Sequence, residues 1–487
     1  MIEIIAALSR WSQLTANLII FGCCVFFAIT MQHRSLSSTR WIERIERKFP
    51  WMAGIILLGL IGILATTTSE ATGIAENLWN PYVWFDIVQQ TQIGHIWIIR
   101  TLSAAFLLAI TLYFIRLKRE RWHYILVAIV AALPIIAGTF MSHSSADEMS
   151  FASIAPYAVH ILLAGTWFGA LPAILLLLFS DNAQSDAITA TDKSGYLHKF
   201  SQLAMPVMLL LLVTGVIVTD RLVAGLYHTL VASNYGWLLN LKLSILAIIL
   251  LIAYQVRNTW LPIMTKTGRD MDRQHSIFSL KKWVRIEFIF ALLLVLIATI
   301  LANTLPAKHS MVQNWPYPFR FSFNATDDPI AQEIIRLGMA LFLVALGAIW
   351  LGIRSHWSKL KLVVIPGVLV LSASAIALPL MTLKSYPETY LKPSVPFDAV
   401  SISNGMKLFA ENCVNCHGYQ GKGTGNIIDP KVKDPTDLLT EPHTASYTVG
   451  NTYHYLTHGI SGTAMPGFAE TLSEEDRWDL INFLHAL

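Results

Sequence analysis

A five-residue run near the C-terminus carries the strongest chemical signal in the sequence. Residues 413–417 read CVNCH, so Cys413 and Cys416 are three positions apart and His417 follows directly. This spacing is that of c-type haem attachment, where two thiols form thioethers to the porphyrin and the histidine is the proximal iron ligand. On a helix, residues three apart share a face, so both sulfurs can reach one macrocycle. The run predicts a single, covalently bound haem c.

A methionine further along the chain is the predicted sixth ligand of the iron. Residues 462–468 read GTAMPGF, and we expect the Met465 thioether to coordinate the haem because a loop braced by Pro466 holds it. His443, His454 and His458 are the competing ligands, and a haem with two histidine ligands would have a low potential. The alternative interpretation of these three histidines is that they are exposed loop residues.

A second group of residues could bind copper. Imidazole and thioether together are ligands that Cu(I) and Cu(II) accept. The predicted helix ends on one side of the membrane carry five such side chains: His95, Met141, His143, Met149 and His160. Against this, a single interfacial histidine or methionine is usually a packing or snorkelling residue. Arg100 and Lys242 lie at a similar predicted depth and could pair with nearby carboxylates.

The elements that position these residues are membrane helices. Of 487 residues, 54% are hydrophobic and 14% are charged, and the mean hydropathy is +0.53. A bilayer core needs about 20 apolar residues per helix. Ten runs of roughly that length qualify: Leu14 to Met31, Trp51 to Thr68, Ile96 to Ile115, Tyr124 to Met141, Ala158 to Phe179, Phe200 to Thr219, Trp237 to Val256, Ile286 to Thr304, Ile335 to Ile353 and Leu362 to Leu383. The net charge of +4 is spread over short loops, which excludes nucleic acid as a partner and leaves membrane lipid.

The loop charges predict the orientation. Alternate loops hold about twenty lysines and arginines on one side and three on the other, namely Arg221, Lys308 and Arg320. By the positive-inside rule the richer side is cytoplasmic, so both termini lie outside. Covalent haem attachment occurs in the periplasm, which gives the same orientation. The predicted location is a bacterial inner membrane, with the haem domain in the periplasm.

The C-terminal part of the sequence predicts a small all-α domain. After Pro393 the composition becomes polar and glycine-rich. A short amphipathic helix is expected to end at Asn412, just before the haem motif. The final segment begins with Ser473 and Asp476 at capping-box spacing and continues at helical spacing to Leu487. Residues 396–487 therefore read as a haem domain that follows the all-α membrane bundle.

Two family resemblances extend this interpretation. The chain from Ser403 to Leu487 resembles class I cytochromes c, including the glycine-rich run at 418–423. Residues 1–310 resemble the CopD copper-resistance membrane proteins, with eight of the ten helices. The likeness rests on four fragments: HILLAGTWFG at 160–169, GHIWIIR at 94–100, GWLLNLKL at 236–243 and the segment 285–307. The resemblance implies periplasmic copper handling, and residues 311–395 supply two further helices and a linker.

Three hypotheses about function follow. In the first, the chain transfers single electrons between the tethered haem and copper bound by the membrane domain, with a soluble cytochrome or a terminal oxidase as the redox partner; a cuprous oxidase activity is its concrete version. In the second, the helices transport copper and the haem is accessory. The third is a quinol–cytochrome c oxidoreductase, which needs opposed histidine pairs for b-type haems between the helices.

Overall fold

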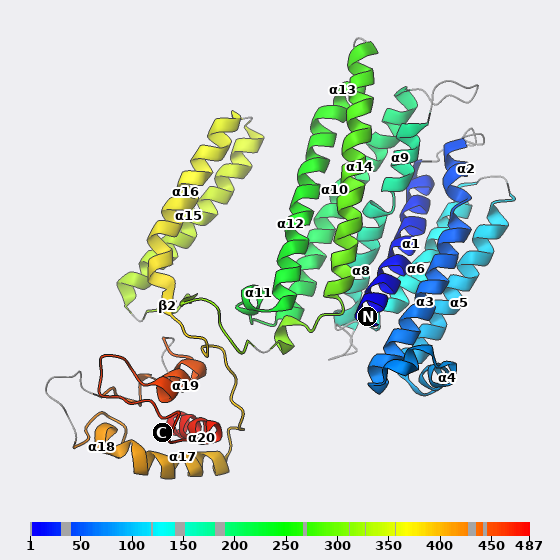
Figure 1. The fold of residues 1–487 in the computed structure, drawn as a ribbon. Coiled ribbons are helices and arrows are strands. Elements are labelled where there is room, and N and C mark those ends of the chain that lie inside the picture. Colours follow the sequence, from blue (N-terminus) through cyan, green and yellow to red (C-terminus); the bar gives the residue numbers. More distant parts are fainter. Residues whose placement is uncertain are drawn as a thin grey trace. The chain divides into compact units, whose positions relative to one another are not determined.

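The computed structural model describes most of the chain in two compact units, Met1–Ser310 and Met311–Leu487. The described residues are 2–30, 40–117, 120–141, 151–180, 190–265, 270–310, 312–326, 328–355, 357–426, 435–441 and 446–487. His143 and Met149, two of the predicted copper ligands, and His443 lie outside this range. Figure 1 shows the helices and strands of both units.

Ten helices in the described residues are long and apolar enough to cross a membrane, which confirms the prediction of an all-α polytopic bundle. In the first unit the membrane helices are α1 (Ile2–Thr30), α3 (Phe49–Thr72), α5 (Gln92–Phe114), α6 (Arg121–Thr139), α8 with α9 (Phe151–Phe168, Leu171–Phe179), α10 (Ala190–Val223), α12 (Asn234–Gln255) and α14 (Asp270–Leu301). Shorter elements join them: α2 (Arg40–Glu46), η2 (Ala75–Trp79), α4 (Pro81–Gln90), α11 (Thr229–Ala232), η3 (Val256–Trp260), α13 (Leu261–Thr265) and η4 (Ala307–His309).

Helix α1 is the centre of the first unit. It packs against α3, α6, α8 and α14 (Figure 1), and most of its apolar stretch is buried. Its crossing with α8 and α9 depends on small residues, since a methyl group on Gly22 would overlap the backbone of Gly165 and one on Gly169 would overlap the Leu18 carbonyl oxygen. Close approach at small residues is how membrane helices gain packing energy where lipid removes the hydrophobic drive.

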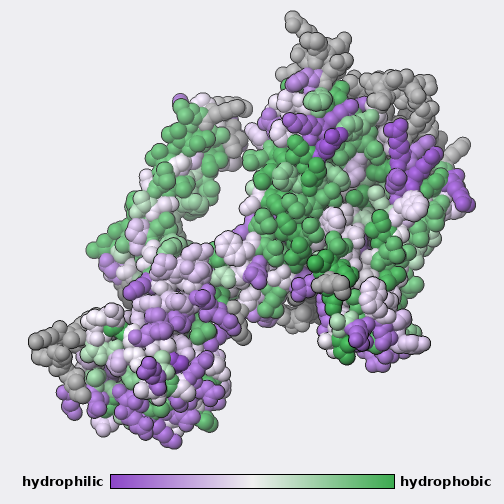
Figure 2. All heavy atoms as spheres, in the orientation of Figure 1, coloured by the Kyte–Doolittle hydropathy of each residue, from purple (hydrophilic) through white to green (hydrophobic). Residues whose placement is uncertain are grey.

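The second unit begins with a helical hairpin, α15 (Pro329–Arg354) and α16 (Lys359–Met381), which pack along each other. Many of their large apolar side chains are exposed, as helices facing lipid require. The short strands β1 (Phe319–Phe321) and β2 (Thr382–Lys384) pair antiparallel, Phe319 opposite Lys384, at the base of this hairpin. Figure 2 shows the contrast between the hydrophobic surface of these long helices and the largely hydrophilic C-terminal part.

The last part of the second unit is a small all-α domain. It consists of α17 (Ala399–Asn412), α18 (Val414–His417), α19 (Val449–His458) and α20 (Glu474–Ala486). Helix α20 begins with the predicted capping box, because the Ser473 and Asp476 side chains each bond the other's backbone N–H. Its Trp478 is completely buried and stacks on Tyr453 of α19, with ring centroids 4.4 Å apart.

The close approach of α1 to Gly169, which lies between α8 and α9, yields a testable prediction. Gly169→Ala is expected to destabilise the membrane unit, because the added methyl must displace the Leu18 backbone and such overpacking costs about 1–3 kcal/mol. Gly54→Ala in α3 is the matched control, since a methyl there meets nothing within 4 Å. Thermal denaturation in detergent compares the two variants, and equal melting temperatures would contradict the packing role of Gly169.

Candidate haem site and polar clusters of the membrane unit

Helices α17 and α20 form the frame on which the haem motif sits. Gly405 of α17 lies so close to α20 that a methyl group there would overlap the Asp479 carbonyl. A buried polar network fastens the same crossing: the Ser401 hydroxyl and the Asn404 amide both donate to the Asp479 carboxylate, and Asn482 donates to the Ser401 hydroxyl at 2.8 Å. Because buried networks specify one arrangement, the first half of α17 is held against α20.

The haem motif follows directly from this frame. Helix α17 ends at Asn412, Cys413 is its C-cap, and α18 carries the rest of the motif to His417. Cys413 is buried, Cys416 is half-buried, and the two thiols form no disulfide. Two backbone N–H groups of the glycine-rich loop, those of Gly423 and Gly425, fold back onto the carbonyls of His417 and Cys416 at 2.9 and 3.1 Å. The loop therefore wraps the motif.

The imidazole of His417 is oriented for metal ligation. Its Nδ1 donates to the Thr436 carbonyl at 3.3 Å, which leaves Nε2 with its lone pair. Burial lowers the pKa of His417 below its ordinary value, although the hydrogen bond to Thr436 opposes this, so the ring is neutral near pH 7. Burial, with Cys416 nearby, raises the pKa of Cys413 to about 12. The Cys413 thiol is therefore neutral near pH 7.

The loop that carries Met465 closes on the same core. The Ile460 N–H donates to the Met465 carbonyl, and the Met465 N–H donates to the Thr463 hydroxyl, both at 3.2 Å. Gly459 turns the chain with a φ of 73° at the end of α19. Met465 packs against the buried cluster that contains Cys413 and Phe409. The structure thus brings Met465 and the CVNCH motif to one apolar core, and this donor set fits a covalently held haem.

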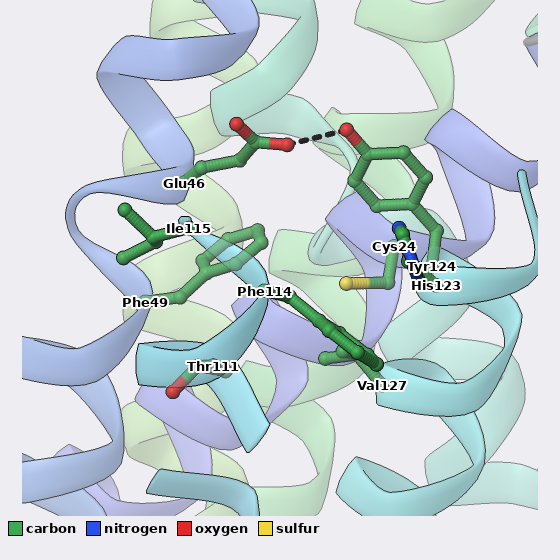
Figure 3. Close-up of a pocket in the computed structure, with 9 residues that line it drawn as sticks. All are labelled: Cys24, Glu46, Phe49, Thr111, Phe114, Ile115, His123, Tyr124 and Val127. Atoms are coloured by element: carbon green, nitrogen blue, oxygen red, sulfur yellow. Dashed lines mark hydrogen bonds between the residues drawn. The ribbon is translucent and has the colours of Figure 1, made fainter. Parts of the chain in front are cut away.

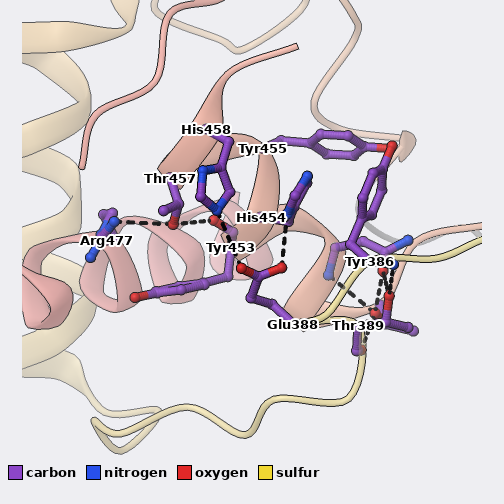
Figure 4. Close-up of polar contacts among 11 residues, drawn as sticks. Tyr386, Glu388, Thr389, Tyr453, His454, Tyr455, Thr457, His458 and Arg477 are labelled. Carbon is purple, nitrogen blue, oxygen red and sulfur yellow. Dashed lines mark hydrogen bonds and ion pairs between the residues drawn. The ribbon is translucent and has the colours of Figure 1, made fainter. Parts of the chain in front are cut away.

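Two of the histidines that compete with Met465, His454 and His458, bond another partner (Figure 4), and His443 lies outside the described residues. Helix α19 buries Tyr453 and Leu456 in the apolar core, while His454 and His458 both bond the Glu388 carboxylate. Glu388 belongs to the segment between β2 and α17. Sequence reasoning missed Glu388, because nothing in the sequence signals that this connector folds back onto α19.

The predicted copper ligands have separate contacts in the described residues. The Arg100 guanidinium donates to the Met141 thioether at 3.5 Å, and His160 Nδ1 meets the Thr214 hydroxyl at 3.1 Å. His95 lies exposed near the start of α5. Lys242 is near enough to His160 to act on it electrostatically. With His143 and Met149 outside the described residues, a shared copper site stays a prediction.

Three buried polar residues of the membrane unit, Gln13, Asn17 and Glu287, were not predicted from the sequence as site residues. Arg100 bonds the buried Gln13 amide oxygen at 3.0 Å rather than a carboxylate. One turn further along α1, Asn17 is completely buried, and neither its oxygen nor its nitrogen has a partner in the described residues. Trp167 donates to the buried Glu287 carboxylate at 3.2 Å. Buried polar groups are costly in a bilayer and usually functional, which is the signal that could have marked them.

Comparisons with known protein families match both the membrane unit and the C-terminal domain. Residues 1–154 match the family described as Copper resistance protein D-like, N-terminal domain, residues 194–301 match Copper resistance protein D, and residues 402–487 match Cytochrome c. The chain therefore carries CopD-like domains followed by a C-terminal cytochrome c domain. This confirms both predicted resemblances, and a cytochrome c domain implies haem c and redox protein partners.

Two relatives cover the two parts separately. Copper resistance protein D of Pseudomonas syringae pv. tomato is 24% identical over 257 residues, which is 50% of this chain and 78% of that protein. The cytochrome c subunit of a quinone alcohol dehydrogenase from Gluconobacter oxydans (strain 621H) is 28% identical over 82 residues, 16% of this chain. The match spans only 17% of that subunit. No solved structure matches significantly.

The two cysteines of α1 are packing residues of the CopD-like domain. Cys23 and Cys24 are completely buried, and the Cys23 thiol donates to the Gly169 carbonyl at 3.1 Å. Cys24 lines a cavity of about 30 Å³ with His123, where the Tyr124 hydroxyl donates to the Glu46 carboxylate (Figure 3). A space of this size holds about one water molecule. These thiols are therefore inert core groups.

Glu388 generates a pH prediction for the cytochrome c domain. Burial raises the pKa of Glu388, but the hydrogen bonds from His454 and His458 lower it more, so the net pKa is below its ordinary value. A lowered folded pKa means that the carboxylate stabilises the domain above about pH 4.3 and loses this effect as the pH falls through the folded value.

We therefore expect the Glu388→Gln variant to have a lower melting temperature than wild type at pH 7 when both are measured with a chelator that removes free metal ions. The difference in melting temperature should shrink below pH 4. Melting curves of the haem absorption across this pH range measure it. A difference that stays constant with pH would show that the Glu388 charge is not the cause.

Proposed function

We propose that this protein is a membrane-anchored c-type cytochrome that transfers single electrons in the periplasm and is coupled to copper at its CopD-like domain. The observation that carries the proposal is the arrangement of the CVNCH motif, with His417 Nδ1 fixed by the Thr436 carbonyl and Met465 on the same core. When bound, the haem supplies one reversible electron between ferrous and ferric iron.

The roles of the protein groups follow from their positions. Cys413 and Cys416 anchor the macrocycle through their sulfurs, and His417 offers Nε2 to the iron. Met465 offers a thioether, a soft ligand that favours ferrous iron and raises the potential. The buried α17–α20 crossing excludes water from this side of the site, which supports the same effect.

The proposed location is the inner membrane of a bacterium, with the cytochrome c domain and both termini in the periplasm. The charge difference between alternate loops supports this orientation. Haem attachment requires it as well, because the thioethers are made outside the cytoplasm.

The copper-linked chemistry would be the one-electron oxidation of Cu(I) to Cu(II), and a haem held by Cys413, Cys416, His417 and Met465 would supply the one-electron acceptor. His95, Met141, His143, Met149 and His160 are the proposed ligands on the outer face of the CopD-like domain. A soluble cytochrome or a terminal oxidase then accepts the electron from the haem. Since both domains belong to one chain, tethering maintains a high effective concentration of donor and acceptor.

The haem assignment predicts opposite outcomes for two kinds of variant. Cys413→Ser combined with Cys416→Ser is expected to abolish covalent haem, because no sulfur remains for a thioether. Met465→Ala is expected to keep covalent haem with a lower potential. Pyridine haemochrome spectra of denatured protein and a spectroelectrochemical titration provide the two readouts. Covalent haem in the double serine variant would overturn the proposal.

A second candidate function, copper transport through the bundle, is favoured by Asn17. Its fully buried, unpartnered amide on α1 lies one turn from the Gln13–Arg100 pair, so α1 carries a polar face inside the membrane unit. A polar side chain buried in a membrane bundle without a hydrogen-bond partner often has a functional role, and here that role would be to contact a copper ion that crosses the bundle.

Vesicles containing the purified protein, with the haem outside, distinguish the two functions. Electron coupling predicts that external Cu(I) reduces the haem, more slowly in His95→Ala with His160→Ala, and unchanged in Asn17→Leu. Transport predicts that copper in the vesicle lumen falls about tenfold or more in Asn17→Leu and in Arg100→Gln, because loss of a polar contact to the ion costs about 1–3 kcal/mol. Transport should be unchanged in Met465→Ala. Metal analysis of the lumen and stopped-flow haem absorption measure the two processes.

A further inference from the structure

A second cluster of metal-ligand groups lies where the connector before α17 packs on α19 of the cytochrome c domain. Glu388, His454 and His458 each offer one donor atom, and the three atoms lie within 4.8 Å of one another. Glu388 Oε2 is 2.8 Å from His454 Nδ1, and Glu388 Oε1 is 3.2 Å from His458 Nε2 (Figure 4). No other group of three such side chains this close occurs among the described residues.

We propose that this triad binds a single divalent copper ion. Two imidazole nitrogens and one carboxylate oxygen are borderline and hard donors, which suit Cu(II) and Zn(II) rather than Cu(I). Neighbouring ligands bonded at about 2.0–2.1 Å in a tetragonal site lie about 2.9 Å apart, similar to the 2.8 and 3.2 Å between Glu388 and the two histidines. The choice of copper over zinc rests on the proposed function, whereas the site itself rests on geometry alone.

The two histidines are pre-arranged by their helix. Positions 454 and 458 are four apart and so lie on one face of α19, whose N-cap Thr448 accepts from the Asn451 N–H. The imidazole of His454 stacks on the Tyr386 ring, with centroids 3.8 Å apart and an interplanar angle of 15°. His454 is thereby held with Nδ1 toward the triad, so little side-chain entropy is lost when an ion binds.

The carboxylate is brought to the helix by a packed connector. Thr389, next to Glu388, is buried and donates to the Asn451 side chain at 2.7 Å, and its carbonyl accepts from the Thr448 hydroxyl. Gly450 makes this approach feasible, because a methyl group there would overlap the Glu388 carbonyl. Glu388 is therefore positioned by backbone contacts on both sides, which is the rigid support that a metal site needs.

The site is open on one side. The Glu388 and His454 side chains are 20% and 18% exposed, whereas His458 is 53% exposed. An ion can enter from solvent past His458, and a water molecule or an external ligand can take the fourth position. When the ion replaces the hydrogen bonds of Glu388, each histidine carries its proton on the ring nitrogen that faces away from the triad.

The test uses the full-length, haem-loaded protein in detergent, stripped with chelator and titrated with Cu(II). We expect one Cu(II) per chain at this site, with an electron paramagnetic resonance signal that shows nitrogen coupling. Glu388→Gln, His454→Ala and His458→Ala should each weaken this binding by more than about 100-fold, beyond the loss typical of outer-shell changes. His485→Ala, in the same domain but outside the triad, is the control and should bind as wild type does.

The design separates this proposal from the proposed function. Covalent haem content and haem reduction by Cu(I) report on the function, while the copper signal of the triad reports on this site. His458→Ala is the main variant because its exposed side chain can be removed without disturbing the fold, and haem content verifies this. Unchanged copper binding in all three triad variants overturns the site. Zinc binding that copper cannot displace overturns the assignment to copper.

Discussion

Lipid offers a polypeptide no hydrogen-bond partner, and this constraint governs the architecture. Every backbone polar group in the hydrocarbon must be satisfied within its own helix, so the apolar runs become helices and their identity follows from length and composition. Lipid also removes the hydrophobic drive for helix association. The bundle is therefore held where small residues allow backbones to touch, as Gly22, Gly165 and Gly169 do around α1.

The same constraint gives meaning to the polar groups that α1 and its neighbours bury. Arg100 satisfies Gln13 and contacts Met141, and Trp167 satisfies Glu287, so these groups form pairs across helices. Asn17 differs from the other buried polar residues described because both its amide oxygen and its amide nitrogen lack a partner. A bundle built only for anchoring a cytochrome would not need such groups. Together with the matches to the copper-resistance families, these groups support the proposed copper handling by the membrane unit.

The sequence predicted the features that depend on local pattern. Ten apolar runs became the ten membrane helices, and the capping residues Ser473 and Asp476 begin α20. The CVNCH spacing located the haem motif because its chemistry is read within five residues. The partners of Arg100 could not be predicted, since Gln13 is distant in sequence and no periodicity links the two. Glu388 could not be predicted for a similar reason. It meets His454 and His458 only because the connector packs onto Gly450, and no local sequence pattern indicates that contact.

That connector also changes how the tether should be understood. A linker between α16 and the cytochrome c domain was expected over the residues before 396, yet much of it is packed. Trp315 donates to the Pro387 carbonyl at 2.7 Å, β2 pairs with β1, and Thr389 is fastened to α19 through Asn451. Residues 382–391 therefore belong to the surface of the domain rather than to a free chain. The haem domain and the α15–α16 hairpin share one folded unit, and the joint to the CopD-like domain lies at Ser310 and Met311. An ion held by Glu388, His454 and His458 would reinforce the packed connector.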